Sequence, residues 1–128
     1  MRTDALFAAV ILSLVGAAAM ADDAPQLTGT WKGKSQGISM KGGYIDGGDV
    51  TIVISEQKGR SFKGEITYPG RGQPVTEAIV GTVGPDGDRV LFVGDEGHHI
   101  AEYDDGVLQD CYVSDDNSMA VCMELTKQ

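Results

Sequence analysis

The sequence predicts an all-β fold, an eight-stranded antiparallel up-and-down barrel. Three observations lead to this prediction. Apolar residues recur with period two from Leu27 onward, Gly, Asp, Asn or Pro separates the runs at short intervals, and no stretch has the period of a helix. Consecutive hairpin-linked strands hide their edges by closing into a barrel, which also buries one face of each strand. A two-sheet sandwich is the alternative.

The first 21 residues have the pattern of a secretory signal peptide. Arg2 precedes an apolar run over residues 5–15, and Ala19 and Ala21 offer a cleavage site. The run is short for a membrane-spanning helix. We therefore expect a signal peptide (1–21), a short N-terminal segment (22–26) and one barrel domain (27–128). The mature protein is expected in the bacterial periplasm or outside the cell, with no membrane attachment after cleavage.

Eight β-branched or aromatic runs are the expected strands: residues 29–35, 49–56, 61–68, 77–83, 89–94, 98–104, 107–114 and 119–126. Most connectors between them have the length of a hairpin turn. Asp105-Gly106 supplies the positive φ angles that tight hairpins need.

The connector over residues 36–48 is longer. It is rich in Gly and carries apolar side chains, among them Met40 and Tyr44. We consider two interpretations, a lid or partner-binding tip at one end of the barrel, or a disordered loop whose apolar residues tuck into the barrel mouth.

The two cysteines test the last hairpin. If its turn is centred between Asp116 and Asn117, Cys111 lies directly opposite Cys122. Opposed side chains of an antiparallel pair are close enough for a disulfide after a small adjustment. In an exported protein the sequence therefore predicts a structural Cys111–Cys122 bridge.

The same pairing predicts which side chains point into the barrel. The more apolar face of the last hairpin includes Asp110 and Tyr112, and Tyr68 shares a face with the apolar residues of its strand. Asp110 is either a ligand-orienting or acid–base group inside the barrel, or a rim residue that reaches water. Strands 89–94 and 98–104 cannot be oriented, so Glu102 joins this set only if it faces inward. The candidate ligand-binding residues are Met40, Tyr44, Tyr68, Glu102, Asp110 and Tyr112.

The formal charge of −9 argues against nucleic acid and anionic membranes as partners, since both require a cationic face. Residues 86–128 hold eleven acidic and two basic residues, whereas residues 22–85 hold seven of each. A macromolecular partner should therefore be basic and should meet the last four strands. His98 and His99 are adjacent on a strand and point to opposite faces, so no metal site is expected. We also expect no cofactor and assign no catalytic residue.

The opening segment Leu27-Thr28-Gly29-Thr30-Trp31 resembles the first strand of avidin-type and lipocalin-type barrels, the calycin group. Later segments look like small secreted bacterial proteins without an assigned function. The resemblance implies eight antiparallel strands closing a cup. It also implies structural roles for Gly29 and Trp31, with Lys127 stacked on the indole at the closed end. Avidin-like biotin sites use several Trp, and this chain has Trp31 alone, so biotin binding is not implied.

These observations favour a non-catalytic barrel that binds a small or apolar ligand. The first alternative is a protein-binding module, such as an inhibitor of an exported enzyme, acting through the 36–48 connector and an acidic surface. The second is a cup-shaped enzyme that uses Asp110 or Glu102 as an acid or base.

Overall fold

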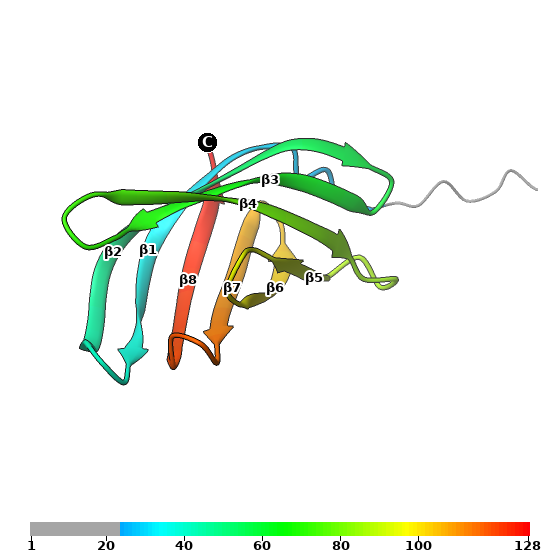
Figure 1. The fold of residues 1–128 in the computed structure, drawn as a ribbon. Coiled ribbons are helices and arrows are strands. Elements are labelled where there is room, and N and C mark those ends of the chain that lie inside the picture. Colours follow the sequence, from blue (N-terminus) through cyan, green and yellow to red (C-terminus); the bar gives the residue numbers. More distant parts are fainter. Residues whose placement is uncertain (1–23) are drawn as a thin grey trace, which may run out of the picture.

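The computed structural model describes residues 24–128, which form a closed antiparallel barrel of eight strands (Figure 1). The predicted fold class is confirmed, and the sandwich alternative is wrong. The predicted signal peptide lies outside the described residues. Within the described part of the chain, no helix is long and apolar enough to cross a membrane. The strands are β1 (Gly29–Ser39), β2 (Gly43–Lys58), β3 (Ser61–Pro69), β4 (Pro74–Val83), β5 (Arg89–Val93), β6 (His98–Asp104), β7 (Val107–Ser114) and β8 (Met119–Lys127).

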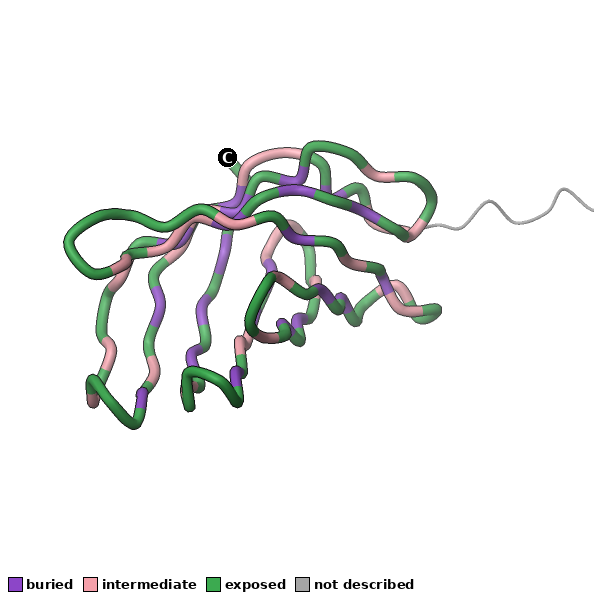
Figure 2. The backbone as a smooth tube through the Cα atoms, viewed as in Figure 1, coloured by how far each residue is buried: buried purple, intermediate pink, exposed green. Residues whose placement is uncertain are grey.

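The barrel closes between its first and last strands. Each strand pairs with the next one along the chain, and β1 also pairs with β8, from Trp31 opposite Lys127 to Ser39 opposite Met119. Closure therefore gives every strand two neighbours, although β4 pairs with β5 only over Val80–Val83. Figure 2 shows buried and exposed residues alternating along the strands, as a pleated sheet with one inward face requires.

The prediction of a long connector over residues 36–48 is wrong. β1 continues to Ser39 and β2 begins at Gly43, so the turn spans only residues 40–42. The glycines were interpreted as loop residues, but Gly37 lies in β1, where a Cβ atom would overlap the Ala120 carbonyl of β8. Glycine is needed there because two backbones approach closely, not because the chain is flexible.

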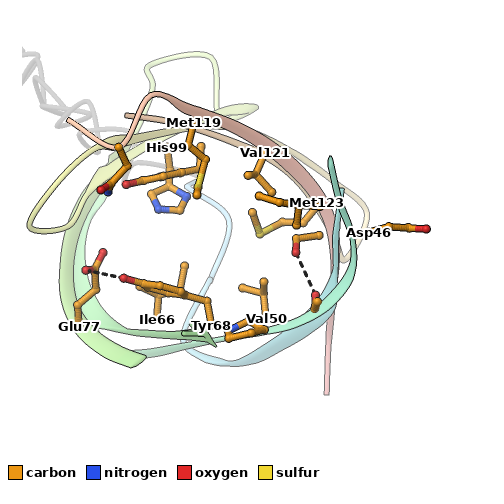
Figure 3. Close-up of a pocket in the computed structure, with 15 residues that line it drawn as sticks. Asp46, Val50, Ile66, Tyr68, Glu77, His99, Met119, Val121 and Met123 are labelled. Atoms are coloured by element: carbon orange, nitrogen blue, oxygen red, sulfur yellow. Dashed lines mark hydrogen bonds between the residues drawn. The ribbon is translucent and has the colours of Figure 1, made fainter. Parts of the chain in front are cut away.

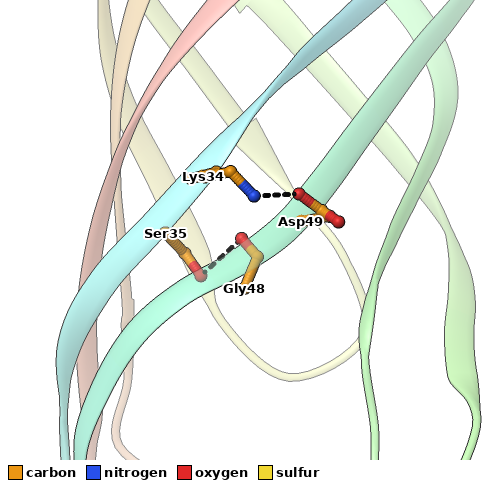
Figure 4. Close-up of polar contacts among 4 residues, drawn as sticks. All are labelled: Lys34, Ser35, Gly48 and Asp49. Atoms are coloured by element: carbon orange, nitrogen blue, oxygen red, sulfur yellow. Dashed lines mark hydrogen bonds and ion pairs between the residues drawn. The ribbon is translucent and has the colours of Figure 1, made fainter.

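The β1–β2 ladder contains one irregularity, at Ser35 and Gln36. Next to it, Ser35 Oγ donates a hydrogen bond of 3.1 Å to the Gly48 carbonyl (Figure 4). Lys34 forms an exposed 2.8 Å ion pair with Asp49. A bulge of this kind bends and twists the ladder, and this allows the long hairpin to wrap around the barrel.

One end of the barrel is filled by Trp31, whose side chain is fully buried. Its indole nitrogen donates a 2.8 Å hydrogen bond to the Leu27 carbonyl, and its ring meets Tyr103 edge-on with centroids 6.3 Å apart. Lys127 Nζ lies 5.8 Å from the indole centroid, the contact that the calycin resemblance implies. Gly29 makes this possible, because a Cβ there would meet the Lys127 side chain at 2.9 Å.

The last hairpin has the predicted register. Cys111 faces Cys122 and the two form a disulfide, so that prediction is confirmed. The two strands that the sequence left unoriented are also resolved. Phe92 of β5 and His99 of β6 are buried, whereas Glu102 is exposed on the outer face.

Candidate functional site

The end of the barrel opposite Trp31 encloses a cavity of about 320 Å³. It lies toward the turns that follow β1 and β7, because residues beside both turns line it. Most lining residues occupy inward positions of the strands (Figure 3). They are Ser35, Ile45, Asp46, Gly48, Val50, Ile66, Tyr68, Pro69, Glu77, His99, Tyr112, Asn117, Met119, Val121 and Met123.

Much of the wall is apolar. Val50, Ile66, Val121 and Met123 are buried and point into the cavity from β2, β3 and β8. Met119 adds a second thioether closer to the turn. Methionine side chains are flexible and polarizable, and they adapt to ligands of different shapes. The wall therefore suits an apolar molecule.

A tyrosine–carboxylate pair forms the first polar feature of the cavity. Tyr68 Oη of β3 donates to Glu77 Oε2 of β4 over 3.4 Å (Figure 3). Burial raises the pKa of Glu77 above its ordinary value, and the negative charge of Asp95 adds to this effect. Burial and the neighbouring Glu77 raise the pKa of Tyr68 to about 12, so this phenol remains a donor at neutral pH.

The local backbone explains how Glu77 reaches the cavity. β4 pairs with β5 only from Val80 to Val83, so within the described chain residues 74–79 have no strand partner on that side. Glu77 lies in this unpaired half, beside the β5–β6 turn. A Cβ at Gly94 would clash with the Glu77 carboxylate. The missing side chain at Gly94 thus leaves space for the carboxylate.

The second polar feature is a buried histidine–aspartate pair. His99 Nδ1 and Asp110 Oδ2 lie 2.6 Å apart, and the two side chains are 2% and 0% exposed. The imidazole stacks on Phe92, with centroids 4.1 Å apart and planes 11° apart, and meets Tyr112 at 4.9 Å. Burial raises the pKa of Asp110, and the hydrogen bond with His99 opposes this shift. The second oxygen, Asp110 Oδ1, has no hydrogen-bond partner among the described residues.

This pair corrects one interpretation of Asp110. The carboxylate is not a rim residue that reaches water, since the residue is only 1% exposed. The cost of burying a lone carboxylate favoured the rim, but Asp110 is not alone. Its partner was missed because the orientation of β6 was unknown.

The structure brings together only some of the predicted ligand-binding residues. Tyr68 and Tyr112 line the cavity, and Asp110 lies behind His99. Met40 and Tyr44 are 86% and 89% exposed, and Glu102 lies on the outer face. These last three do not line the cavity. Met40 lies in the short turn after β1 and Tyr44 lies in β2, where a long loop was expected, and Glu102 faces outward from β6.

Glu77 and His99 are among the cavity-lining residues that were not predicted from the sequence. A signal for Glu77 was present, because it shares the alternation of Ile79 and Val83, the apolar residues that are buried on the inward face of this strand. No comparable signal existed for His99, because its strand carries polar and apolar residues on both faces. His98 is exposed, so adjacent histidines do point to opposite faces. Among residues 24–128, no group of three or more His, Cys, Asp or Glu is placed to hold a metal ion.

Three of the turns around the cavity are joined by hydrogen bonds. Ser114 Oγ donates to the Glu96 carbonyl over 2.7 Å, and Asn117 Nδ2 donates to the Glu96 carboxylate over 2.8 Å. The Met40 amide donates to the Ser118 carbonyl over 3.0 Å. The β1–β2, β5–β6 and β7–β8 turns thus form one connected rim, which fixes the shape of the cavity.

Comparison with known proteins shows similarity of fold to solved β-barrels. No family model and no curated protein matches the chain. Among solved structures, the chain is similar to a designed fluorescence-activating β-barrel, with 15% identity, a TM-score of 0.57, and coverage of 85% of this chain and 100% of that one. It is also similar to the wild-type fluorescent protein UnaG, with 16% identity, a TM-score of 0.48, and coverage of 80% and 97%. The likeness to the designed barrel concerns the fold, a closed β-barrel.

Proposed function

We propose that this protein binds a small, largely apolar ligand inside its barrel, in the periplasm or outside the cell. The observation that carries the proposal is the cavity of about 320 Å³ at one end of a barrel whose other end is filled. Eight-stranded barrels are either filled by their own side chains or hold one small ligand. Here one end of the barrel is filled by side chains, and the other end has space for a ligand.

The lining chemistry supports this function. Small-molecule sites are mostly apolar, with a few convergent polar groups and a volume of roughly 300–1,000 Å³. The cavity has this composition, with Tyr68, Glu77 and His99 set in an apolar wall. The proposed compartment rests on the predicted signal peptide, and a structural disulfide is typical of oxidising compartments.

Binding can be tested with a neutral apolar dye, N-phenyl-1-naphthylamine, and a variant that fills the cavity. Val121→Phe adds bulk at a lining position, and Val53→Phe adds the same bulk on the outer face, where Val53 is exposed. We expect Val121→Phe to weaken dye binding at least tenfold and Val53→Phe to leave it unchanged, both with wild-type circular dichroism. No dye binding by the wild type, or equal binding by both variants, would contradict the proposal.

The native ligand can be sought by native mass spectrometry of protein purified from its own host. A bound mass that disappears in Val121→Phe supports the proposal. The bare polypeptide mass in every preparation would count against it.

A second candidate function is acid–base catalysis on a molecule held in the same cavity. The contact of 2.6 Å between His99 and Asp110 favours it, because a carboxylate on Nδ1 orients the imidazole and directs Nε2 to the other side. In that reaction class His99, not Asp110, would exchange the proton. Mass spectrometry of a host metabolite extract should then show a product with the wild type and none with His99→Gln. Identical extracts after both incubations would count against catalysis.

The protein-binding alternative loses the loop on which it depended, because residues 36–48 are largely strand. An acidic surface on the last four strands remains, and a basic partner for it stays a prediction.

A further inference from the structure

The charges that line the cavity have one sign. Among the described lining residues there is no Lys or Arg, whereas Asp46 and Glu77 are both acidic. The Asp46 side chain points away from the cavity, and Glu77 points into it (Figure 3). The imidazole of His99 already has a carboxylate partner in Asp110. An anionic ligand would therefore find no unpaired cation on this wall.

Within residues 24–128, Glu77 is held by no Lys or Arg. The groups that most affect its pKa are Asp95, Tyr68, Glu96 and His99, and no Lys or Arg is among them. Its Oε2 accepts the hydrogen bond from Tyr68, while its Oε1 lies beside the backbone of Gly94. A partly buried carboxylate in this position favours a ligand that brings a positive charge or a hydrogen-bond donor.

Aromatic rings surround the same region. Tyr68 and Tyr112 line the cavity, and the tilted contact of Tyr112 with His99 continues into the stack on Phe92. A cation over a tyrosine face gains an electrostatic attraction to the ring that a neutral or anionic group does not gain. The tyrosine rings and the Glu77 carboxylate therefore both favour a ligand with a cationic head group.

The turns at this end add a negative potential. The β1–β2, β3–β4, β5–β6 and β7–β8 turns carry four acidic and two basic residues: Asp95, Glu96, Asp115, Asp116, Lys41 and Arg71. A mouth with net negative charge concentrates cations and repels anions.

We infer that the cavity selects cationic amphiphiles, holding an ammonium group between the Glu77 carboxylate and the tyrosine rings, with the apolar part against Val50, Val121 and Met123. This inference rests on the proposed ligand-binding function and adds the class of ligand. The ammonium donates to Glu77 Oε1, which leaves the Tyr68 hydrogen bond to Oε2 in place. The alkyl or aryl part of the ligand then lies on the apolar wall.

Three probes with the same tail test the inference: n-octylamine, 1-octanol and octanoate, titrated by calorimetry at pH 7 into the mature chain. We expect octylammonium to bind at least tenfold more tightly than octanol, and octanoate to bind most weakly. Octanoate binding as tightly as octylammonium would overturn the inference.

Two variants separate the local carboxylate from the overall negative field. Glu77→Gln removes the charge inside the cavity, and Glu65→Gln removes the same charge from an exposed position on β3. We expect Glu77→Gln to weaken octylammonium about tenfold and to leave octanol unchanged. Glu65→Gln should leave both unchanged. An equal loss of octylammonium affinity in both variants would overturn the assignment of the ammonium to Glu77.

The octanol arm keeps the two proposals distinguishable. If octanol binds and octylammonium shows no preference, the cavity binds small molecules but the inferred head-group selectivity is wrong. If none of the three probes binds, and the neutral dye fails as well, the ligand-binding function itself is wrong.

Discussion

His99 Nδ1 and Asp110 Oδ2 lie 2.6 Å apart between neighbouring strands, with both side chains almost completely buried. The pair links β6 to β7, with His99 in the cavity wall and Asp110 behind it. It also accounts for a carboxylate in a position where burial alone would be costly, because the imidazole supplies the hydrogen bond that water no longer provides.

Replacing one member of this pair should destabilise the protein more than replacing both. His99→Phe keeps a ring to stack on Phe92 but leaves Asp110 without a partner, so we expect a loss of about 3 kcal/mol or more in the free energy of unfolding. The double variant His99→Phe/Asp110→Leu should recover much of that loss. Urea denaturation at pH 7 measures both values. A double variant less stable than His99→Phe would contradict this account.

The raised pKa of Glu77 predicts a small pH-dependent stability effect. Because the folded protein holds this proton more tightly than the unfolded chain, the free energy of unfolding falls as pH rises from the ordinary glutamate pKa to the raised one. The groups that act on Glu77 are Asp95, Tyr68, Glu96 and His99.

Glu77→Gln removes this effect. At neutral pH it should be more stable than the wild type by roughly a few tenths of a kcal/mol, since the side chain is partly solvated. The difference should vanish below about pH 4, where both proteins are neutral at this position. Thermal melts at several pH values check this, with Glu65→Gln as the control. A variant that is more stable but binds octylammonium poorly would show that Glu77 is retained at a cost in stability.

The disulfide should contribute modestly to stability. Cys111 and Cys122 already face each other across a hairpin, so the bond closes a short loop that the ladder partly closes on its own. We expect the Cys111→Ala/Cys122→Ala variant to fold and to lose about 1–3 kcal/mol of unfolding free energy. Denaturant titration with and without a reducing agent provides the comparison. Complete unfolding of the variant would show that this estimate is too low.

The close approach of β1 to β8 depends on glycine. A Cβ at Gly37 would overlap the Ala120 carbonyl, so Gly37→Ala should cost about 2 kcal/mol or more through strain or loss of the β1–β8 ladder. Gly42 lies in the adjacent turn, where a Cβ would meet only the Ser39 hydroxyl at 3.0 Å. Gly42→Ala is therefore the matched control and should be tolerated. Equal melting temperatures for the two variants would contradict the packing argument.

Met40 and Tyr44 provide a test of the corrected site. Both side chains are highly exposed and neither lines the cavity. The Met40→Ser/Tyr44→Ser variant should bind N-phenyl-1-naphthylamine with unchanged affinity, whereas Val121→Phe should not. A tenfold loss of dye affinity in the double variant would restore these residues to the binding site.

Strand alternation and turn residues were sufficient to predict the barrel, because both are local properties of the chain. The last hairpin shows how far this reasoning extends, since a single turn position fixed the pairing of Cys111 with Cys122. The 36–48 segment shows where it fails. Gly37 lets the backbone of β1 approach Ala120 of β8 closely, and nothing near Gly37 in the sequence indicates that contact.

Only part of the site could be predicted, because local alternation places some lining residues and not others. Tyr68 and Tyr112 followed from alternation within strands of clear polarity. His99 did not, because β5 is apolar on both faces and β6 mixes polar and apolar residues on both faces, so only the closed ladder decides which face is inside. Pairing of His99 with Asp110 further depends on the register between β6 and β7, which local periodicity does not specify.

The closing ladder between β1 and β8 also constrains when the protein can fold. Seven of the eight strand pairings join neighbours in the sequence, but the eighth joins Trp31 to Lys127. During synthesis, the first strand has no second partner until β8 is available. The Cys111–Cys122 pair lies within a single hairpin, so its oxidation does not have to wait for closure. A chain that lost β8 would present two open edges to its neighbours, a form prone to self-association.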